Sequence, residues 1–160
     1  MKKVPIQDLT PFLCAVLGGI CLSIAVAAAD SLDQQLLLAA KQGDATAVRS
    51  LLRSRAPANA ADADGTTALH WAVRADSDAV ARLLIQSGAR TSAANRYGIT
   101  PLSLAAANGS LRLTRALLEA GADPNATTPE GETILMTAAR TGSPEVIERL
   151  IAAGASLPRH

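Results

Sequence analysis

The sequence predicts an all-α solenoid built from a repeated pair of short helices. A shift of 33 residues superimposes the chain on itself at many positions. Each copy carries the same signals in the same order: a turn glycine, a threonine that can cap a helix, two apolar helical stretches and a closing glycine. Two helices of about ten residues each are marginal alone in water, because nucleation is costly and one apolar face stays wet. The unit therefore needs neighbours of its own kind, and stacking such units gives a solenoid.

The most complete copy covers residues 97–126, YGITPLSLAAANGSLRLTRALLEAGADPNA. Thr100 is placed to cap the first helix through its side-chain oxygen. Gly109 ends that helix, because glycine tolerates the left-handed backbone that follows a helix. Ser110 is expected to cap the second helix, whose leucines are spaced three to four apart, and Gly121 to end it.

The other copies repeat this plan. The 33-residue shift aligns the turn glycines, the cap threonines, the first-helix leucines and the closing glycines: Gly65, Gly98 and Gly131; Thr67, Thr100 and Thr133; Leu69, Leu102 and Leu135; Gly88, Gly121 and Gly154. A degenerate first copy, with Leu36 and Ala39 in register, is predicted to cap the N-terminal end. We expect four repeats, at about residues 31–62, 63–95, 96–128 and 129–158.

Four segments resemble the ankyrin-repeat family: GTTALHWAV (65–73), GITPLSLAA (98–106), GETILMTAA (131–139) and LLEAGADPNA (117–126). The resemblance covers roughly residues 31–156. It implies stacked helix-turn-helix units with β-turn fingers, and a structural role for His70 as a side chain that binds the backbone of a neighbouring turn. Three departures from the signature make individual loops less regular. Ser103 and Met136 replace the histidine, Asp76 replaces the glycine between helices, and residues 90–92 (RTS) replace the Asp-x-Asn close.

Residues 1–29 are a different kind of segment. Lys2 and Lys3 give a positive start, residues 12–29 are uncharged and apolar, and the run ends in small residues before Asp30. This order is typical of a secretory signal peptide cut after Ala27 or Ala29, and it predicts a periplasmic or secreted protein. The alternative is an uncleaved membrane anchor, since the apolar run is about as long as a minimal transmembrane helix.

Composition argues against several classes of function. Loss of residues 1–29 would bring the 15 basic and 14 acidic side chains to 13 each, with no basic stripe for nucleic acid. Cleavage would also remove both cysteines, Cys14 and Cys21, and with them any thiolate site. We find no zinc-ligand spacing, no phosphate-binding glycine loop and no base beside a candidate nucleophile, so the chain is expected to have no catalytic, cofactor or metal site. Trp71 is interpreted as a packing residue.

The remaining candidate for function is a binding surface. Turn tips and first-helix residues of a solenoid vary without harm to the core, and the family resemblance implies that partners bind at the fingers and the concave face. Carried over by position, the candidate partner-binding residues are Asp64, Thr66, Arg74, Arg96, Tyr97, Ile99, Asn108, Glu130, Glu132 and Arg140, with Lys41, Gln42, Ala63, Ala75, Ala107, Pro129 and Thr141 beside them. Arg96, Tyr97 and Ile99 are the predicted anchors, because tyrosine and arginine dominate interfaces and an apolar tip needs an explanation.

The sequence therefore predicts a non-catalytic, exported protein–protein interaction module, expected to be a monomer. One alternative is a membrane-anchored scaffold or a shortened member of a longer array. A second is an enzyme or small-ligand binder with a groove beside Trp71, which would require convergent ionisable residues there.

Overall fold

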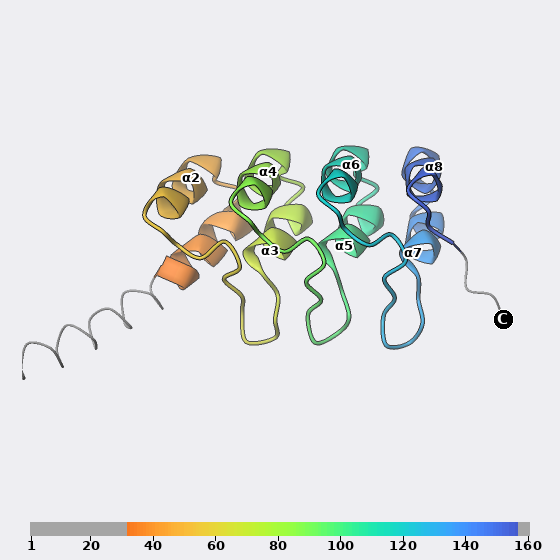
Figure 1. Cartoon of the computed structure of the whole chain (residues 1–160), viewed down its shortest axis with the longest axis horizontal. Helices are drawn as coiled ribbons and strands as arrows, with labels where there is room; N and C mark the ends of the chain where they lie inside the picture. The colour runs from red at the N-terminus through yellow and green to blue at the C-terminus, as the bar shows by residue number, and fades with distance from the viewer. Residues whose placement is uncertain (1–31, 157–160) are drawn as a thin grey trace, which may run out of the picture.

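The computed structural model describes residues 32–156, which form four stacked pairs of helices (Figure 1). Residues 32–42 form a helix that pairs with α2 (Ala45–Arg53). The following pairs are α3 (Ala68–Arg74) with α4 (Asp78–Gln86), α5 (Pro101–Ala107) with α6 (Leu111–Glu119), and α7 (Ile134–Thr141) with α8 (Pro144–Ala152). The all-α solenoid with about four repeats is confirmed. The predicted signal segment at residues 1–29 lies outside the described residues.

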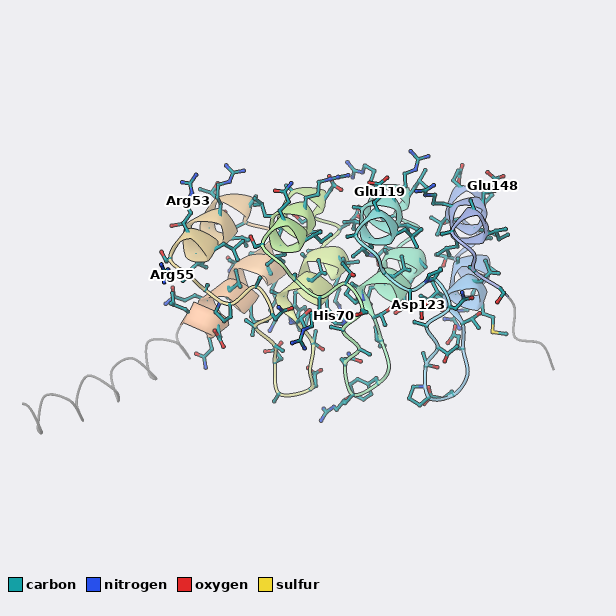
Figure 2. All side chains as sticks on the ribbon, in the orientation of Figure 1. Arg53, Arg55, His70, Glu119, Asp123 and Glu148 are labelled. Carbon is teal, nitrogen blue, oxygen red and sulfur yellow. The ribbon has the colours of Figure 1, made fainter. Side chains whose placement is uncertain are left out.

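The helices form two rows. The first helix of each pair lies in the inner row and the second in the outer row, and long loops extend past the inner row (Figure 1). We call these loops the fingers: residues 61–67, 94–100 and 127–133. We call the surface formed by the inner helices and the fingers the concave face. Charged side chains such as Arg53, Glu119 and Glu148 project from the outer helices, away from the fingers (Figure 2).

Threonines begin the inner helices as predicted. The Thr67, Thr100 and Thr133 side chains each accept a hydrogen bond from the backbone N–H three residues later. Such a cap satisfies one of the N–H groups that have no partner inside the helix.

The outer helices begin differently. Ser110 occupies the N-cap position of α6, but its side chain makes no capping hydrogen bond, so that part of the prediction is wrong. The same holds for Ser77 and Ser143. Ser77 and Ser143 pack against the preceding repeat instead, because a methyl group added to Gly43 or Gly109 would touch the side chain of Ser77 or Ser143.

The core has the predicted residues. In each repeat the aligned leucines of the inner helix and the apolar stripe of the outer helix are buried: Leu69, Leu102 and Leu135; Val80, Leu113 and Val146; Leu84, Leu117 and Leu150. Leu36, Ala39 and Ala40 are buried in the same way in the first repeat. Burial of these side chains between neighbouring helix pairs supplies the hydrophobic stabilisation that a single pair lacks.

The fingers are tight turns with the same backbone bonds in each copy. In the second finger, Asn95 N–H donates to Ile99 O at 3.0 Å and Gly98 N–H to Asn95 O at 2.9 Å. Two isolated antiparallel bridges, between residues 61 and 67 and between 127 and 133, close the other two. Arg96 N–H donates to Asp64 O at 2.9 Å and joins the first finger to the second.

The loops after the outer helices are closed by asparagine side chains. Asn59 Nδ2 donates to Gly88 O at 3.2 Å, and Asn59 Oδ1 accepts from Arg90 N–H at 2.8 Å. Asn125 makes the same pair of bonds to Gly154 and Ser156, so residues 56–60 and 122–126 are closed in the same way. Ser92 stands at the intervening position, where Thr91 Oγ1 donates to Ala120 O at 3.3 Å instead.

Candidate functional site

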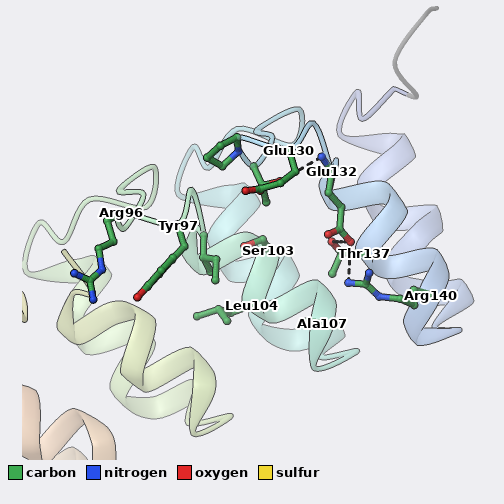
Figure 3. A pocket seen from close by; sticks show the side chains of 12 residues that line it. Arg96, Tyr97, Ser103, Leu104, Ala107, Glu130, Glu132, Thr137 and Arg140 are labelled. Carbon is green, nitrogen blue, oxygen red and sulfur yellow. Dashed lines mark hydrogen bonds and ion pairs between the residues drawn. The ribbon is translucent and has the colours of Figure 1, made fainter. Parts of the chain in front are cut away.

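A groove of about 530 Å³ lies on the concave face between the second and third fingers, over α5 and α7 (Figure 3). Six of the predicted partner-binding residues line it: Arg96, Tyr97, Ile99, Glu130, Glu132 and Arg140. Its floor is formed by inner-helix residues, among them Ser103, Leu104, Ala107 and Thr137. From their positions in the repeat, the sequence predicts only that these residues share one face. The structure shows that residues from two repeats line the same groove.

The groove is open because its side chains are small, whereas large side chains fill the equivalent space between the first two repeats. The 33-residue shift places Lys41 and Arg74 at the position of Ala107, and Trp71 at the position of Thr137. Between the first two repeats, Lys41 Nζ lies 4.2 Å from the centroid of the Trp71 ring and fills that space. Between the third and fourth repeats, Ala107 and Thr137 leave it empty.

One wall of the groove is an exposed aromatic ring. Tyr97 is 53% exposed, and Arg96 Cζ lies 5.0 Å from the centroid of its ring. The Tyr97 ring and the Arg96 guanidinium therefore stack on each other at the tip of the second finger (Figure 3). Ile99 is half-buried rather than fully exposed, and its carbonyl oxygen is bonded to His70.

The opposite wall carries an ion pair. Arg140 Nη2 lies 2.8 Å from Glu132 Oε1, which also accepts a hydrogen bond from Thr137 Oγ1 at 3.1 Å. Glu130 is exposed on the third finger, and no cation of residues 32–156 forms an ion pair with it. The groove is thus lined by two basic and two acidic side chains around a floor that has both apolar (Leu104, Ala107) and hydroxyl (Ser103, Thr137) side chains.

Three of the remaining predicted residues serve the scaffold. Asp64 Oδ1 accepts from Thr66 N–H at 2.9 Å, and this bond lowers the pKa of the Asp64 carboxyl. Thr66 is buried, and its hydroxyl accepts from Asn95 Nδ2 at 3.2 Å, so its side chain holds two fingers together. Asn108 Nδ2 donates to Val73 O at 2.9 Å, which caps the end of the preceding inner helix.

His70 has the structural role that the resemblance implies. It lies at the base of the fingers (Figure 2), and its Nε2 is 2.9 Å from Ile99 O in the next finger. Its Nδ1 lies 3.1 Å from Thr67 N, which donates to it. These two contacts assign the proton to Nε2. Burial lowers the pKa of His70, opposed by its bond to Ile99 O and by the charge of Asp64.

A second cluster, around Trp71, was missed by sequence reasoning. The half-buried Trp71 ring has Lys41 Nζ at 4.2 Å and Arg74 Cζ at 5.5 Å from its centroid. Trp71 Nε1 donates to Asp62 Oδ2 at 2.7 Å. The sequence predicts Arg74 and Lys41 as surface residues and Trp71 as a packing residue, and it gives no signal for Asp62. A detectable signal was the recurrence of a basic residue at positions 41, 74 and 140 of the 33-residue register.

Two further findings concern residues 32–156. Their His, Asp and Glu side chains form no group of three that could hold a metal ion. None of their helices has the length and apolar character needed to cross a membrane.

Comparison with known families agrees with the fold. A family model described as ankyrin repeats (3 copies) matches residues 12–95, 36–128 and 91–159. None of the curated proteins matches the chain significantly. The matched regions together span most of the sequence and include all four helix pairs. The chain belongs to the ankyrin-repeat family.

Proposed function

We propose that the protein is a non-catalytic interaction module, exported from the cytoplasm, that binds a partner protein through the groove and fingers of its concave face. Ankyrin repeats are generally protein–protein interaction modules. The observation that carries the proposal for this chain is the groove, with Tyr97 exposed on one wall and the Glu132–Arg140 pair on the other.

The chemistry of the groove favours a polypeptide as its occupant. Leu104 and Ala107 in its floor can contact an apolar side chain of a partner, and its walls offer both donors and acceptors for the partner's backbone and polar groups. Tyrosine and arginine are enriched among the residues whose truncation costs most binding energy, typically more than about 2 kcal/mol. Tyr97 and Arg96 are already stacked in the free protein, so little conformational entropy is lost when they bind.

The test is affinity capture with the purified protein as bait. The variant carries Arg96→Ala and Tyr97→Ala, and the matched control carries Arg112→Ala and Arg115→Ala on the outer helix α6, where both side chains are exposed. We expect one partner to be captured by the wild type and by the control but not by the Arg96/Tyr97 variant. Equal capture by all three baits would show that the partner binds elsewhere.

Export is tested by the mass of the protein isolated from its natural cell. A signal peptidase cut after Ala27 or Ala29 would leave a chain without the first 27 or 29 residues. An intact mass that includes residues 1–29, recovered in the membrane fraction, would favour the anchored scaffold instead.

A further inference from the structure

The Trp71 cluster lies one repeat away from the groove on the same face. Arg74 and Ala107 occupy equivalent positions on α3 and α5, as their separation of 33 residues requires. Neither Trp71 nor Asp62 lines the groove. The cluster is therefore a separate place on the concave face, next to the groove.

The charges of the cluster do not cancel. Asp62 Oδ2 lies 3.3 Å from Lys41 Nζ and also accepts the indole N–H, so its carboxylate offsets the lysine. Arg74 is exposed and contacts the ring of Trp71, and no carboxylate within residues 32–156 pairs with it. One positive charge therefore remains beside a half-buried aromatic surface.

A guanidinium on an aromatic ring is well suited to bind a carboxylate. The ring holds the plane of the guanidinium, whose N–H groups then present two parallel donors to an acid. Such bidentate, charge-assisted hydrogen bonds are stronger than neutral ones. Tryptophan and arginine are both enriched among binding hot spots.

We propose that Arg74, supported by Trp71, binds an acidic side chain of the partner segment whose bulky apolar side chain occupies the groove. This inference rests on the proposed function and adds the chemistry of the partner. Packed helices lie about 8–10 Å apart, and an extended chain advances about 3.3 Å per residue. The centre of the groove, over α5 and α7, is about one and a half helix spacings from α3. The acidic residue and the apolar residue are therefore separated by about four positions.

Charge on the same face favours an acidic side chain over a polyanion. Asp62 belongs to the cluster, Asp64 lies on the same finger, and Glu130 and Glu132 line the groove. A nucleic acid crossing this face would bring its phosphates against these carboxylates, which is unfavourable. A single Asp or Glu of a polypeptide reaches Arg74 without that repulsion.

The experiment selects ligands without knowledge of the natural partner. A random peptide library displayed on phage is selected against the full chain. An enriched peptide is then synthesised without tryptophan, and its binding is followed by the fluorescence of Trp71, the single tryptophan of the chain. We expect enriched peptides to share Asp or Glu about four positions from a large apolar residue, and their binding to change the emission of Trp71.

Two variants distinguish binding of the acid at Arg74, which we call the carboxylate subsite, from binding in the groove. Arg74→Glu should weaken binding of the selected peptide roughly tenfold, and a Lys in place of the peptide's acid should restore it, because opposite charges at a rim attract and like charges repel. Lys41 fills the equivalent space between the first two repeats. Ala107→Lys would place the same side chain in the groove and should therefore abolish binding. Arg115→Glu on α6 and Ala79→Lys on α4 are the matched controls at exposed positions.

Each outcome has one meaning. Peptides that lose binding with Ala107→Lys but are indifferent to Arg74→Glu would overturn the carboxylate subsite and leave the proposed function intact. Peptides indifferent to both variants would contradict the proposed function as well. A library that yields no binder to the folded chain would also contradict both. Thermal unfolding of each variant confirms that the change lies in binding.

Discussion

Thr114 places a hydroxyl group in the core of the third repeat. It is fully buried, and its Oγ1 has no hydrogen-bond partner among residues 32–156. The equivalent positions in the other repeats are Val48, Ala81 and Ile147, all apolar. A buried polar group without a partner destabilises the folded chain, because its bonds to water are lost and not replaced.

Thr114→Val should therefore raise the free energy of unfolding by about 1 kcal/mol, since it keeps the shape and removes the hydroxyl. Urea unfolding of wild type and variant measures this difference. A loss of stability would mean that the hydroxyl has a partner, such as a bound water. Thr141→Val is the contrasting variant, because Thr141 Oγ1 has backbone acceptors at Thr137 O (2.7 Å) and Ala106 O (3.1 Å) and removal of the hydroxyl should destabilise.

His70 makes stability depend on pH in a predictable direction. Its pKa in the folded chain is below 6.5, mainly because burial disfavours the charged ring. The unfolded chain therefore binds the proton more readily, and stability falls as pH drops below about 6.5 toward the folded pKa. The stability is fully present above that window. Urea unfolding between pH 8 and pH 5 should show this decline, and a weaker one in His70→Gln. An identical slope in both proteins would exclude His70 as the cause.

At the scale of elements, two loops have a residue other than glycine in the left-handed backbone conformation. Arg55 has a φ of +65°, at the position where the later repeats have Gly88, Gly121 and Gly154. A left-handed backbone costs an ordinary L-residue about 1–2 kcal/mol relative to glycine. Asp76, with a φ of +50°, is the milder case, because aspartate tolerates this region better. The first two repeats thus carry local strain that the later ones avoid.

Arg55→Gly should accordingly raise the free energy of unfolding by roughly 0.5–1 kcal/mol, after the extra entropy of glycine in the unfolded chain is subtracted. Gly121→Ala should lower it by about 1 kcal/mol. No atom lies within 4 Å of a methyl group added to Gly121, so a loss there reflects backbone conformation alone. Thermal unfolding measures both, and a destabilised Arg55→Gly would contradict this account.

The loop between the second and third repeats lacks the asparagine that its neighbours use. Ser92→Asn would place a carboxamide opposite Gly121 O and Asp123 N, as Asn59 and Asn125 stand opposite their partners. Two added hydrogen bonds should stabilise the chain by about 1 kcal/mol. Asn125→Ser, which removes the bonds to Gly154 and Ser156, should destabilise it by a similar amount. Opposite signs in the two variants would support a shared role, and equal signs would refute it.

At the scale of the whole molecule, the two ends of the stack differ from its middle. On the last helix pair, Ile151 is 55% exposed and Met136 is 37% exposed. Leu118, which is equivalent to Ile151 in the third repeat, is half-buried. A repeat with one neighbour buries less apolar surface than a repeat with two, so it opens at lower free energy. Leu38, 55% exposed, marks the other end.

Hydrogen exchange should therefore be faster in α7 and α8 than in α5 and α6. The measurement is the exchange rate of backbone amides at neutral pH, compared between peptides from residues 134–152 and from residues 101–119. Ile151→Arg is not expected to speed the exchange, because the Ile151 side chain is largely in water. Equal protection of the last two repeats would contradict this view.

The sequence by itself determined what is local or periodic. The 33-residue register gave the helix pairs and the buried leucines, because identical units stack identically. Thr100 and its equivalents predicted the inner helix starts through their capping chemistry, and the resemblance identified His70 as a tie between fingers. Six of the candidate residues line one groove, because equivalent positions of stacked repeats lie on one face.

Only the tertiary structure decided what depends on neighbouring repeats. The groove exists because Ala107 and Thr137, thirty residues apart, leave a space that Lys41 and Trp71 fill in the first repeats. The same contacts between repeats turned Thr66 and Asn108 into scaffold residues. Whether a side chain packs, bonds or remains open to a partner depends on the atoms opposite it, and those belong to another repeat.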